Sequence, residues 1–224
     1  MIRKVSVATL FLFAACFVPR ASFATTVTLT LESGSGSPYS FEINGSSTTT
    51  LLSCLNNNLE VNQGESWIAT VYNIGTLVTD GDSKSTNVGG SGITLGELED
   101  DAYLDSLYTS NTTSTTNTEI QDAIWSVLDG KDVYTGLTTQ SEKTAVDNYI
   151  TAAENYNGTS TFYDEFTYYA PTTWGQPGDD DKSGGEPQQF LGYCPAITPE
   201  PSSLLLLGTG IVGLAGVVRR RMRA

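Results

Sequence analysis

The 224-residue sequence contains no histidine. This absence excludes a Ser-His-Asp triad, a Cys-His nucleophile pair and a His-liganded transition-metal site. Basic residues are also scarce, because 11 Lys and Arg stand against 25 Asp and Glu, and the formal net charge is −14. A nucleic-acid binder needs clustered cations that displace counterions from phosphates. We therefore expect no nucleic acid partner.

The few cations lie mostly at the two ends of the chain. Residues 25–198 contain no arginine and four lysines, against 24 acidic residues, so their net charge is about −20. An acidic surface of this kind is hydrated and self-repelling, as in many exported proteins. The length of this part suits one cooperative domain with its own core. We expect a single exported domain over residues 25–198.

The first 24 residues have the composition of a secretory signal peptide. Arg3 and Lys4 precede an apolar run over residues 5–18, and small residues lead to a cut after Ala24. The run is shorter than the roughly 20 residues that span a bilayer, which disfavours an uncleaved anchor. A weaker alternative is a lipobox that ends at Cys16.

The opposite end, residues 199–224, combines three features in a fixed order. A Pro-Glu-Pro motif is followed by an apolar run and then by a basic terminus, formed by Pro199, Glu200 and Pro201, residues 204–218, and Arg219, Arg220 and Arg221. This order resembles the PEP-CTERM sorting signal, which implies an exosortase as partner and cleavage near the motif. The arginines would stop transfer at the cytoplasmic face.

The sorting signal leads to an expected location. We expect export across the inner membrane, anchoring by the C-terminal helix until processing, and then a place on the cell surface or in the extracellular matrix. The alternative is a plain C-terminal anchor that is never cut. Both put the domain outside the cytoplasmic membrane.

Within residues 25–198, apolar periodicity predicts an α+β fold. Segments with period two or aromatic enrichment predict strands at residues 26–32, 39–43, 49–55, 66–74, 160–169 and 189–193. Glycine-rich residues 79–92 and residues 175–186 are expected as loops. The order predicts an antiparallel β-sandwich or barrel-like sheet with a helical insertion of about three helices.

Each of the three expected helices has a capping-box pair at its start. The pairs have the spacing in which a threonine and a Glu or Gln three residues later bond each other's backbone, and they are Thr94 with Glu97, Thr118 with Gln121, and Thr139 with Glu142. The middle helix then has an apolar stripe of period 3.6.

Two short segments carry the chemistry. One ends a predicted strand with Cys54 followed by Leu55, and the other begins the middle helix with Ile120-Gln121-Asp122-Ala123-Ile124-Trp125. Together they resemble the two motifs of bacterial thioester domains. The resemblance implies a bond between the Cys54 sulfur and the Gln121 side chain, with a pocket formed by Leu55, Ile120, Ala123, Ile124 and Trp125.

Some residues depart from those motifs or admit another interpretation. Ser53 stands where a large apolar residue usually precedes the cysteine, and Asp122 interrupts the second motif, so we place Asp122 on the solvent face.

In an exported domain, Cys54 and Cys194 also suit one disulfide. Gln121 would then only complete a capping box.

Two functions therefore remain. The first is a covalent adhesin or cross-linker that reacts once with an amine or hydroxyl on a surface partner or polysaccharide. The second is a non-reactive structural protein of the biofilm matrix. Neither is an enzyme, and we expect no cofactor and no metal. The acidic loops with Asp80, Asp82 and residues 179–181 lack the ligand pattern of an EF-hand and are expected to be solvated.

Overall fold

A computed structural model describes residues 25–33, 37–58, 61–108, 112–172 and 188–193. The predicted signal peptide, the predicted loop at 175–186, Cys194 and the sorting segment at 199–224 lie outside these described residues. The predicted boundaries of the exported domain, 25 and 198, therefore stay predictions.

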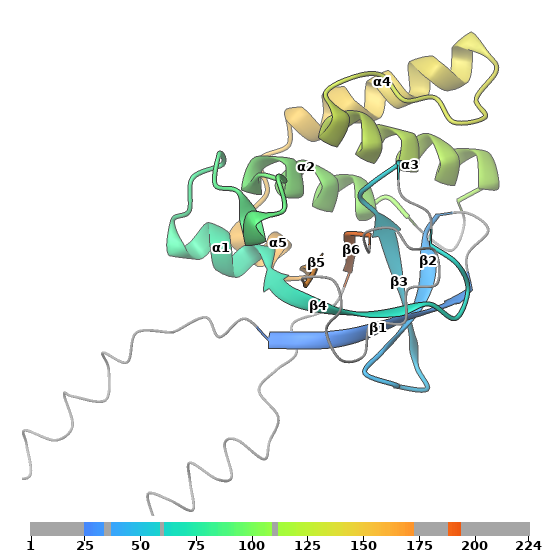
Figure 1. Cartoon of the computed structure of the whole chain (residues 1–224). Coiled ribbons are helices and arrows are strands. Elements are labelled where there is room, and N and C mark those ends of the chain that lie inside the picture. The colour runs from blue at the N-terminus through green and yellow to red at the C-terminus, as the bar shows by residue number, and fades with distance from the viewer. Residues whose placement is uncertain (1–24, 34–36, 59–60, 109–111, 173–187, 194–224) are drawn as a thin grey trace, which may run out of the picture.

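Six antiparallel strands form a closed barrel in the order β1-β2-β3-β6-β5-β4 (Figure 1). The strands are β1 (Thr25–Ser33), β2 (Tyr39–Ile43), β3 (Thr49–Cys54), β4 (Ser66–Asn73), β5 (Phe166–Pro171) and β6 (Phe190–Tyr193). The predicted antiparallel, barrel-like sheet is confirmed.

The barrel interior is filled by alternate side chains of these strands. In β1, Val27, Leu29 and Leu31 point inward and are buried, because successive side chains of a strand face opposite sides. Aromatic rings complete the interior, with the rings of Phe41 and Phe190 4.6 Å apart and tilted by 62°. Such edge-to-face packing of large rings is favourable and directional.

Five helices accompany the barrel, where about three were expected. They are α1 (Ile74–Asp80), α2 (Leu95–Asp105), α3 (Ser114–Asp129), α4 (Gln140–Glu154) and α5 (Ser160–Tyr163), with a short 3₁₀ helix, η2 (Val88–Gly90). Helix α1 lies mainly over residues 75–78, between the predicted strand at 66–74 and the predicted loop at 79–92, and α5 replaces the start of the predicted strand at 160–169. Their caps explain the difference, because the side chains of Asn73 and Thr159 accept hydrogen bonds from backbone N–H groups three residues later.

The predicted start of the middle helix is wrong. Helix α3 begins at Ser114, with Thr113 as its cap, so Thr118 lies inside the helix and its hydroxyl donates to the Ser114 carbonyl at 3.1 Å. Gln121 therefore completes no capping box. The boxes at the starts of α2 and α4 are both formed as predicted.

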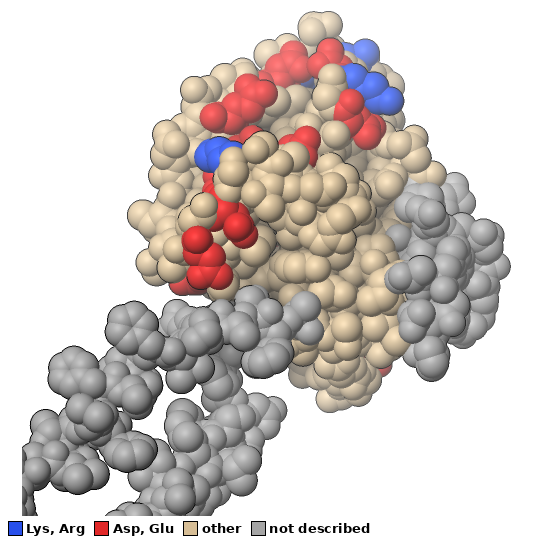
Figure 2. Space-filling view, turned by 60° about the vertical axis from the view of Figure 1, so that its left-hand side comes forward, with Lys and Arg blue, Asp and Glu red and all other residues tan. Residues whose placement is uncertain are grey.

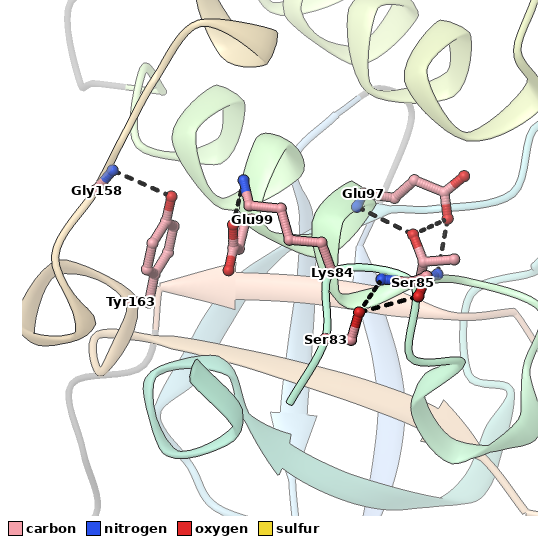
Figure 3. A network of polar contacts seen from close by, with 8 residues as sticks. Ser83, Lys84, Ser85, Glu97, Glu99, Gly158 and Tyr163 are labelled. Atoms are coloured by element: carbon pink, nitrogen blue, oxygen red, sulfur yellow. Dashed lines mark hydrogen bonds and ion pairs between the residues drawn. The ribbon is translucent and has the colours of Figure 1, made fainter. Parts of the chain in front are cut away.

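Residues 79–92, predicted as a loop, are held against α2. The Lys84 ammonium pairs with the Glu99 carboxylate at 2.8 Å (Figure 3). The Gly96 N–H donates to the Lys84 carbonyl at 2.8 Å. Gly96 permits this contact, since a Cβ there would lie 3.2 Å from the Lys84 carbonyl oxygen. The segment also contains η2, and an antiparallel β-bridge joins its Asn87 to Thr94, the cap of α2.

A second core lies between the barrel and the helices. It contains Leu98 of α2, Ile120 and Ile124 of α3 and Val146 of α4, and the strand residue Tyr168 also belongs to it. Among the residues that the structure describes, no helix is long and apolar enough to cross a membrane.

Charge is distributed unevenly between the two parts of the fold. The six strands contain only two acidic residues, Glu32 and Glu42, whereas α2 alone contains five, Glu97, Glu99, Asp100, Asp101 and Asp105. Figure 2 shows the acidic side chains at the top of the domain and in a band down its left side, with few over the centre and the lower right of the view. Self-repulsion is therefore concentrated on the helical side of the domain.

Candidate functional site

Strand β3 positions Cys54 at the boundary between the two cores. Cys54 is the last residue of β3 and pairs with Phe190 of β6, and the next residue, Leu55, donates its N–H to the Gln189 carbonyl at 3.0 Å. The Cys54 side chain belongs to the barrel core, whereas Leu55 belongs to the helical core. Cys54 is 1% exposed, so its sulfur is shielded from water.

Helix α3 places Gln121 directly over this strand end. Its amide Nε2 donates to the backbone carbonyl of Cys54 at 2.7 Å, and its Oε1 accepts a hydrogen bond from the hydroxyl of Ser37. Gln121 is buried, with 3% of its surface exposed. The structure thus brings together the two residues that the sequence motifs singled out, with both ends of the Gln121 amide held.

The remaining pocket residues surround the pair as a mainly apolar wall. Four of them are buried in the helical core, namely Leu55, Ile120, Ala123 and Ile124. Trp125 is half-buried and packs against the barrel core. Its indole N–H makes no hydrogen bond of normal geometry, yet it lies close enough to the Cys54 sulfur to favour the thiolate.

The Cys54 thiol is also hydrogen-bonded. Its single S–H proton is shared between two acceptors, the Asn56 carbonyl oxygen at 3.1 Å from Sγ and the Gln188 Oε1 at 3.0 Å from Sγ. Burial raises the pKa of the thiol to about 11, and the contacts with Asn56, Trp125 and Gln188 act in the opposite direction. Cys54 is a free cysteine in the structure, and Cys194 lies outside the described residues.

Sequence reasoning missed Gln188. It is 2% exposed and comes just before β6, and its contact with Cys54 depends on the pairing of β3 with β6. No local pattern in the sequence indicates that pairing, since the two strands are separated by the whole helical part. A second amide therefore lies beside the thiol.

A second polar group missed by the sequence extends from the pair toward α2. The hydroxyl of Ser53, the neighbour of Cys54, donates to the buried carboxylate of Asp105, whose pKa burial raises to about 7. The Tyr108 hydroxyl donates to Ser37 Oγ at 3.3 Å, and burial raises the pKa of Tyr108 as well. Ser53, which stands where a large apolar residue usually precedes the cysteine, thus has a buried polar partner.

The expected solvent exposure of Asp122 is wrong. Asp122 is fully buried, and its Oδ2 accepts from the Thr135 N–H at 2.6 Å. Burial raises its pKa to about 6, against the hydrogen bond from Thr135. Asp122 therefore ties the segment after α3 to the helix that carries Gln121.

Within the described residues, the acidic loops do not bring potential metal ligands together. Asp80 and Asp82 are exposed, and no group of three or more His, Cys, Asp or Glu side chains suited to a metal occurs among the described residues. Residues 179–181 lie outside that part of the chain.

Comparison with known proteins identifies the C-terminal segment. Residues 198–221 match the family model of the PEP-CTERM protein-sorting motif, which confirms the prediction made from the Pro-Glu-Pro motif, the apolar run and the arginines. The motif implies processing by an exosortase. It also indicates export, anchoring at the membrane during sorting, and delivery to the surface. No curated protein matches the chain.

Two solved structures are similar to the domain. One is the N-terminal thioester domain of a surface protein from Clostridium perfringens, with 15% identity and a TM-score of 0.44, covering 75% of this chain and 98% of that one. The other is the N-terminal thioester domain of fibronectin-binding protein SfbI from Streptococcus pyogenes, with 9% identity and a TM-score of 0.40, covering 79% and 95%. The predicted resemblance is confirmed as a structural similarity.

Proposed function

We propose that the exported domain is a covalent tether in which the Cys54 sulfur and the Gln121 side-chain carbon form a thioester. The observation that carries the proposal is the position of Gln121, a buried glutamine whose amide contacts Cys54 at one end and a hydroxyl at the other. A buried polar side chain needs hydrogen-bond partners. Folding alone, however, does not require that one of these partners be Cys54, the free cysteine of the described residues.

Formation of the bond needs no cofactor. The Cys54 thiolate attacks the Gln121 Cδ, the C–N bond breaks, and the nitrogen leaves as ammonia after taking up the thiol proton. Two groups held in contact by a strand end and a helix react far faster than free groups in solution. The neighbouring closed barrel supplies the rigid frame.

The hydrogen bond from Ser37 supports this chemistry. Its hydroxyl donates to the Gln121 Oε1, the oxygen on which negative charge develops when sulfur attacks the carbon. The bond from Gln121 Nε2 to the Cys54 carbonyl fixes the amide plane relative to the strand. The high pKa of the buried thiol means that deprotonation is an unfavourable part of the step.

The thioester would be opened by an amine or hydroxyl on a partner. The nucleophile attacks the same Cδ, the C–S bond breaks, and the partner is left joined to residue 121 while Cys54 regains its thiol. This event occurs once per molecule, so the protein is a covalent adhesin or cross-linker and not a turnover enzyme. Partners include surface proteins and polysaccharides.

The C-terminal motif would deliver this tether to its place of action. An exosortase that cuts near residues 199–201 releases the domain from the membrane, so the thioester is presented on the cell surface or in the extracellular matrix. The motif is matched at residues 198–221, and β6 ends five residues before that match, at Tyr193.

The intact mass of the full chain under non-reducing conditions tests the proposal. We expect a deficit of one ammonia that is absent from both Cys54→Ala and Gln121→Ala. Incubation with methylamine should then give the mass of the thioester form plus one methylamine. A deficit of two hydrogens would instead mean a disulfide with Cys194. That result, or a full mass, overturns the tether and leaves a passive matrix protein.

A further inference from the structure

The hydroxyl of Tyr108 lies behind the serine that contacts Gln121. Tyr108 Oη is 3.3 Å from Ser37 Oγ, and the Ser37 hydroxyl in turn bonds the Gln121 Oε1. Ser37 precedes β2, Tyr108 follows α2 and Gln121 belongs to α3. Three polar groups from distant segments thus form one hydrogen-bonded chain that ends at the carbonyl of the proposed bond.

The direction of both hydrogen bonds follows from the chemistry of that carbonyl. The Gln121 Oε1 can only accept, so the one proton of the Ser37 hydroxyl is directed to it. The Ser37 oxygen then remains as an acceptor, and the Tyr108 hydroxyl must be the donor. The chain therefore runs from Tyr108 through Ser37 to Gln121.

The Tyr108 proton has a second acceptor. Its hydroxyl oxygen is 3.4 Å from the backbone carbonyl oxygen of Asn117, which lies four residues before Gln121 on α3. One O–H proton is shared between this carbonyl and Ser37, and both distances are long for an O–H···O bond. The proton can therefore turn toward whichever acceptor becomes the stronger one.

Attack of the Cys54 sulfur on the Gln121 carbon would change the balance between these two acceptors. Negative charge develops on Oε1, which strengthens the bond from Ser37 and makes the Ser37 oxygen a better acceptor. Hydrogen bonds in a chain polarise one another in this way. The Tyr108 proton then favours Ser37 over the Asn117 carbonyl, and the charge on Oε1 is stabilised more than by Ser37 alone.

The surroundings of Tyr108 keep its hydroxyl a donor in a fixed place. Burial raises the pKa of the hydroxyl above its ordinary value of 10, so the group holds its proton at neutral pH. The ring packs against the helical core, which also contains Ile120 and Ile124 of α3. The hydroxyl is thus anchored to the same helix that carries Gln121.

We propose that Tyr108 is a positioning residue of the thioester reaction, which orients and polarises the Ser37 hydroxyl toward the Gln121 Oε1. The inference rests on the proposed function. The C–N bond breaks when the thioester forms and the C–S bond breaks when it opens, and the Tyr108 proton stays on the tyrosine in both steps. Because the same oxygen carries the charge each time, Tyr108 assists both.

A double-mutant cycle on the full chain tests this role. Tyr108→Phe keeps the ring in the core and removes only the hydroxyl, and it is made in wild type and in Ser37→Ala. Intact mass gives the rate at which the ammonia deficit appears after refolding in all four chains. Tyr134→Phe is the matched control, because it removes a tyrosine hydroxyl that donates to Asp147 of α4 at 2.9 Å.

We expect Tyr108→Phe to slow thioester formation about threefold to tenfold in wild type, as for the loss of one neutral hydrogen bond. It should not change the rate of Ser37→Ala, in which the chain is already broken, and Tyr134→Phe should match wild type. The same loss in both backgrounds, or no loss in wild type, overturns the positioning role. Absence of an ammonia deficit from wild type would instead mean that the proposed function itself has failed.

Opening of the thioester gives a second readout that does not depend on refolding. Methylamine and hydroxylamine should both open the Tyr108→Phe thioester more slowly, and by the same factor, because charge develops on Oε1 whichever nucleophile attacks. Slowing of only one of them would contradict the proposal, since Tyr108 would then act on the nucleophile and not on the carbonyl.

A third measurement covers the case in which Tyr108→Phe forms no thioester. In Cys54→Ala, which keeps the Gln121 amide, ¹³C NMR of glutamine labelled at Cδ reports the hydrogen bond to Oε1, and Gln121→Ala identifies the signal. Tyr108→Phe should shift this signal in the same direction as Ser37→Ala, and should add no shift once Ser37→Ala is present. A Cδ signal that Tyr108→Phe leaves unchanged would exclude the relay.

Discussion

The side-chain amide of Gln121 donates to the backbone carbonyl of Cys54 at 2.7 Å, although 67 positions separate the two residues. This contact joins α3 to the end of β3. It contributes to stability before any covalent bond forms.

The stability contribution is measurable in a Cys54→Ala background, in which no thioester can form. Adding Gln121→Ala should lower the free energy of unfolding by about 1–3 kcal/mol, because a buried hydrogen-bonded group loses its partner. Urea unfolding of the single and double variants gives the difference. Equal stability of the two would mean that the contact is absent in solution.

Ser37→Ala should slow formation of the thioester. The hydroxyl donates to the oxygen on which charge develops, and removal of one such donor typically costs about 100-fold or more in rate. The readout is the rate at which the ammonia deficit appears after refolding. Ser46→Ala, an exposed position between β2 and β3, serves as the control and should form the bond at the wild-type rate.

Gln188→Ala tests which of the two amides beside the Cys54 thiol, that of Gln188 or that of Gln121, forms the bond. Gln188 accepts from Cys54 Sγ at 3.0 Å, but Gln121 is our proposed site of the bond. We expect the ammonia deficit to persist in Gln188→Ala and to vanish in Gln121→Ala. Gln189→Ala, whose amide bonds the Ser91 carbonyl, is the matched control. The reverse result would move the bond to residue 188.

Asp101→Asn should stabilise the domain at neutral pH. Asp101 is fully buried, neither carboxylate oxygen has a partner, and burial raises its pKa well above the ordinary 3.8. Because the folded pKa is the higher one, stability is greatest below pH 3.8 and falls as the pH rises toward the folded pKa. Asn removes this dependence.

The expected gain at pH 7 is about 1–3 kcal/mol, because Asn removes the negative charge from the buried site. At pH 3, below the ordinary pKa of 3.8, most of the gain should disappear, because wild-type Asp101 then holds its proton in both the folded and the unfolded state. Thermal unfolding at the two pH values measures it. A gain of the same size at both pH values would show that charge is not the cause.

Thr94 and Thr118 each stand three residues before a Glu or Gln, but replacing them with alanine should change the stability by different amounts. Thr94→Ala removes the capping box of α2 and should lower the free energy of unfolding by about 1 kcal/mol. Thr118→Ala lies inside α3 and should change it by at most about 0.5 kcal/mol. Denaturant unfolding measures both. A large loss at Thr118 would favour the shorter helix that the sequence pattern predicts.

The contrast between Thr94 and Thr118 shows what local sequence patterns can and cannot predict. Strand alternation predicted β1 and β2 well, because Val27, Leu29 and Leu31 face one interior. Capping spacing predicted the starts of α2 and α4 but failed at Thr118, since any Thr followed by Gln three residues later has the same spacing. Only the preceding residues, with Thr113 accepting from the Thr116 N–H, decide where α3 begins.

The candidate site could be predicted in part. Motif residues Cys54 and Gln121 were identified without the fold, because their pattern is local to a strand end and a helix. The residues that support the pair were not identified, because they come from distant segments. Ser37 precedes β2 and contacts Gln121, Gln188 precedes β6 and contacts Cys54, and Asp105 of α2 contacts Ser53, the neighbour of Cys54. Asp122 was misplaced for the same reason, because its partner Thr135 lies beyond the end of α3.

The closed barrel has a consequence for copies of the domain that gather at high density on one surface. Each of the six described strands is paired on both sides, so none of them offers an unpaired edge. Growth of ordered fibres by strand addition needs such an edge. Neighbouring copies that associate through the described barrel must therefore use side chains. In a polymer of this domain, the copies would be joined by covalent cross-links and not by a continuous β-sheet.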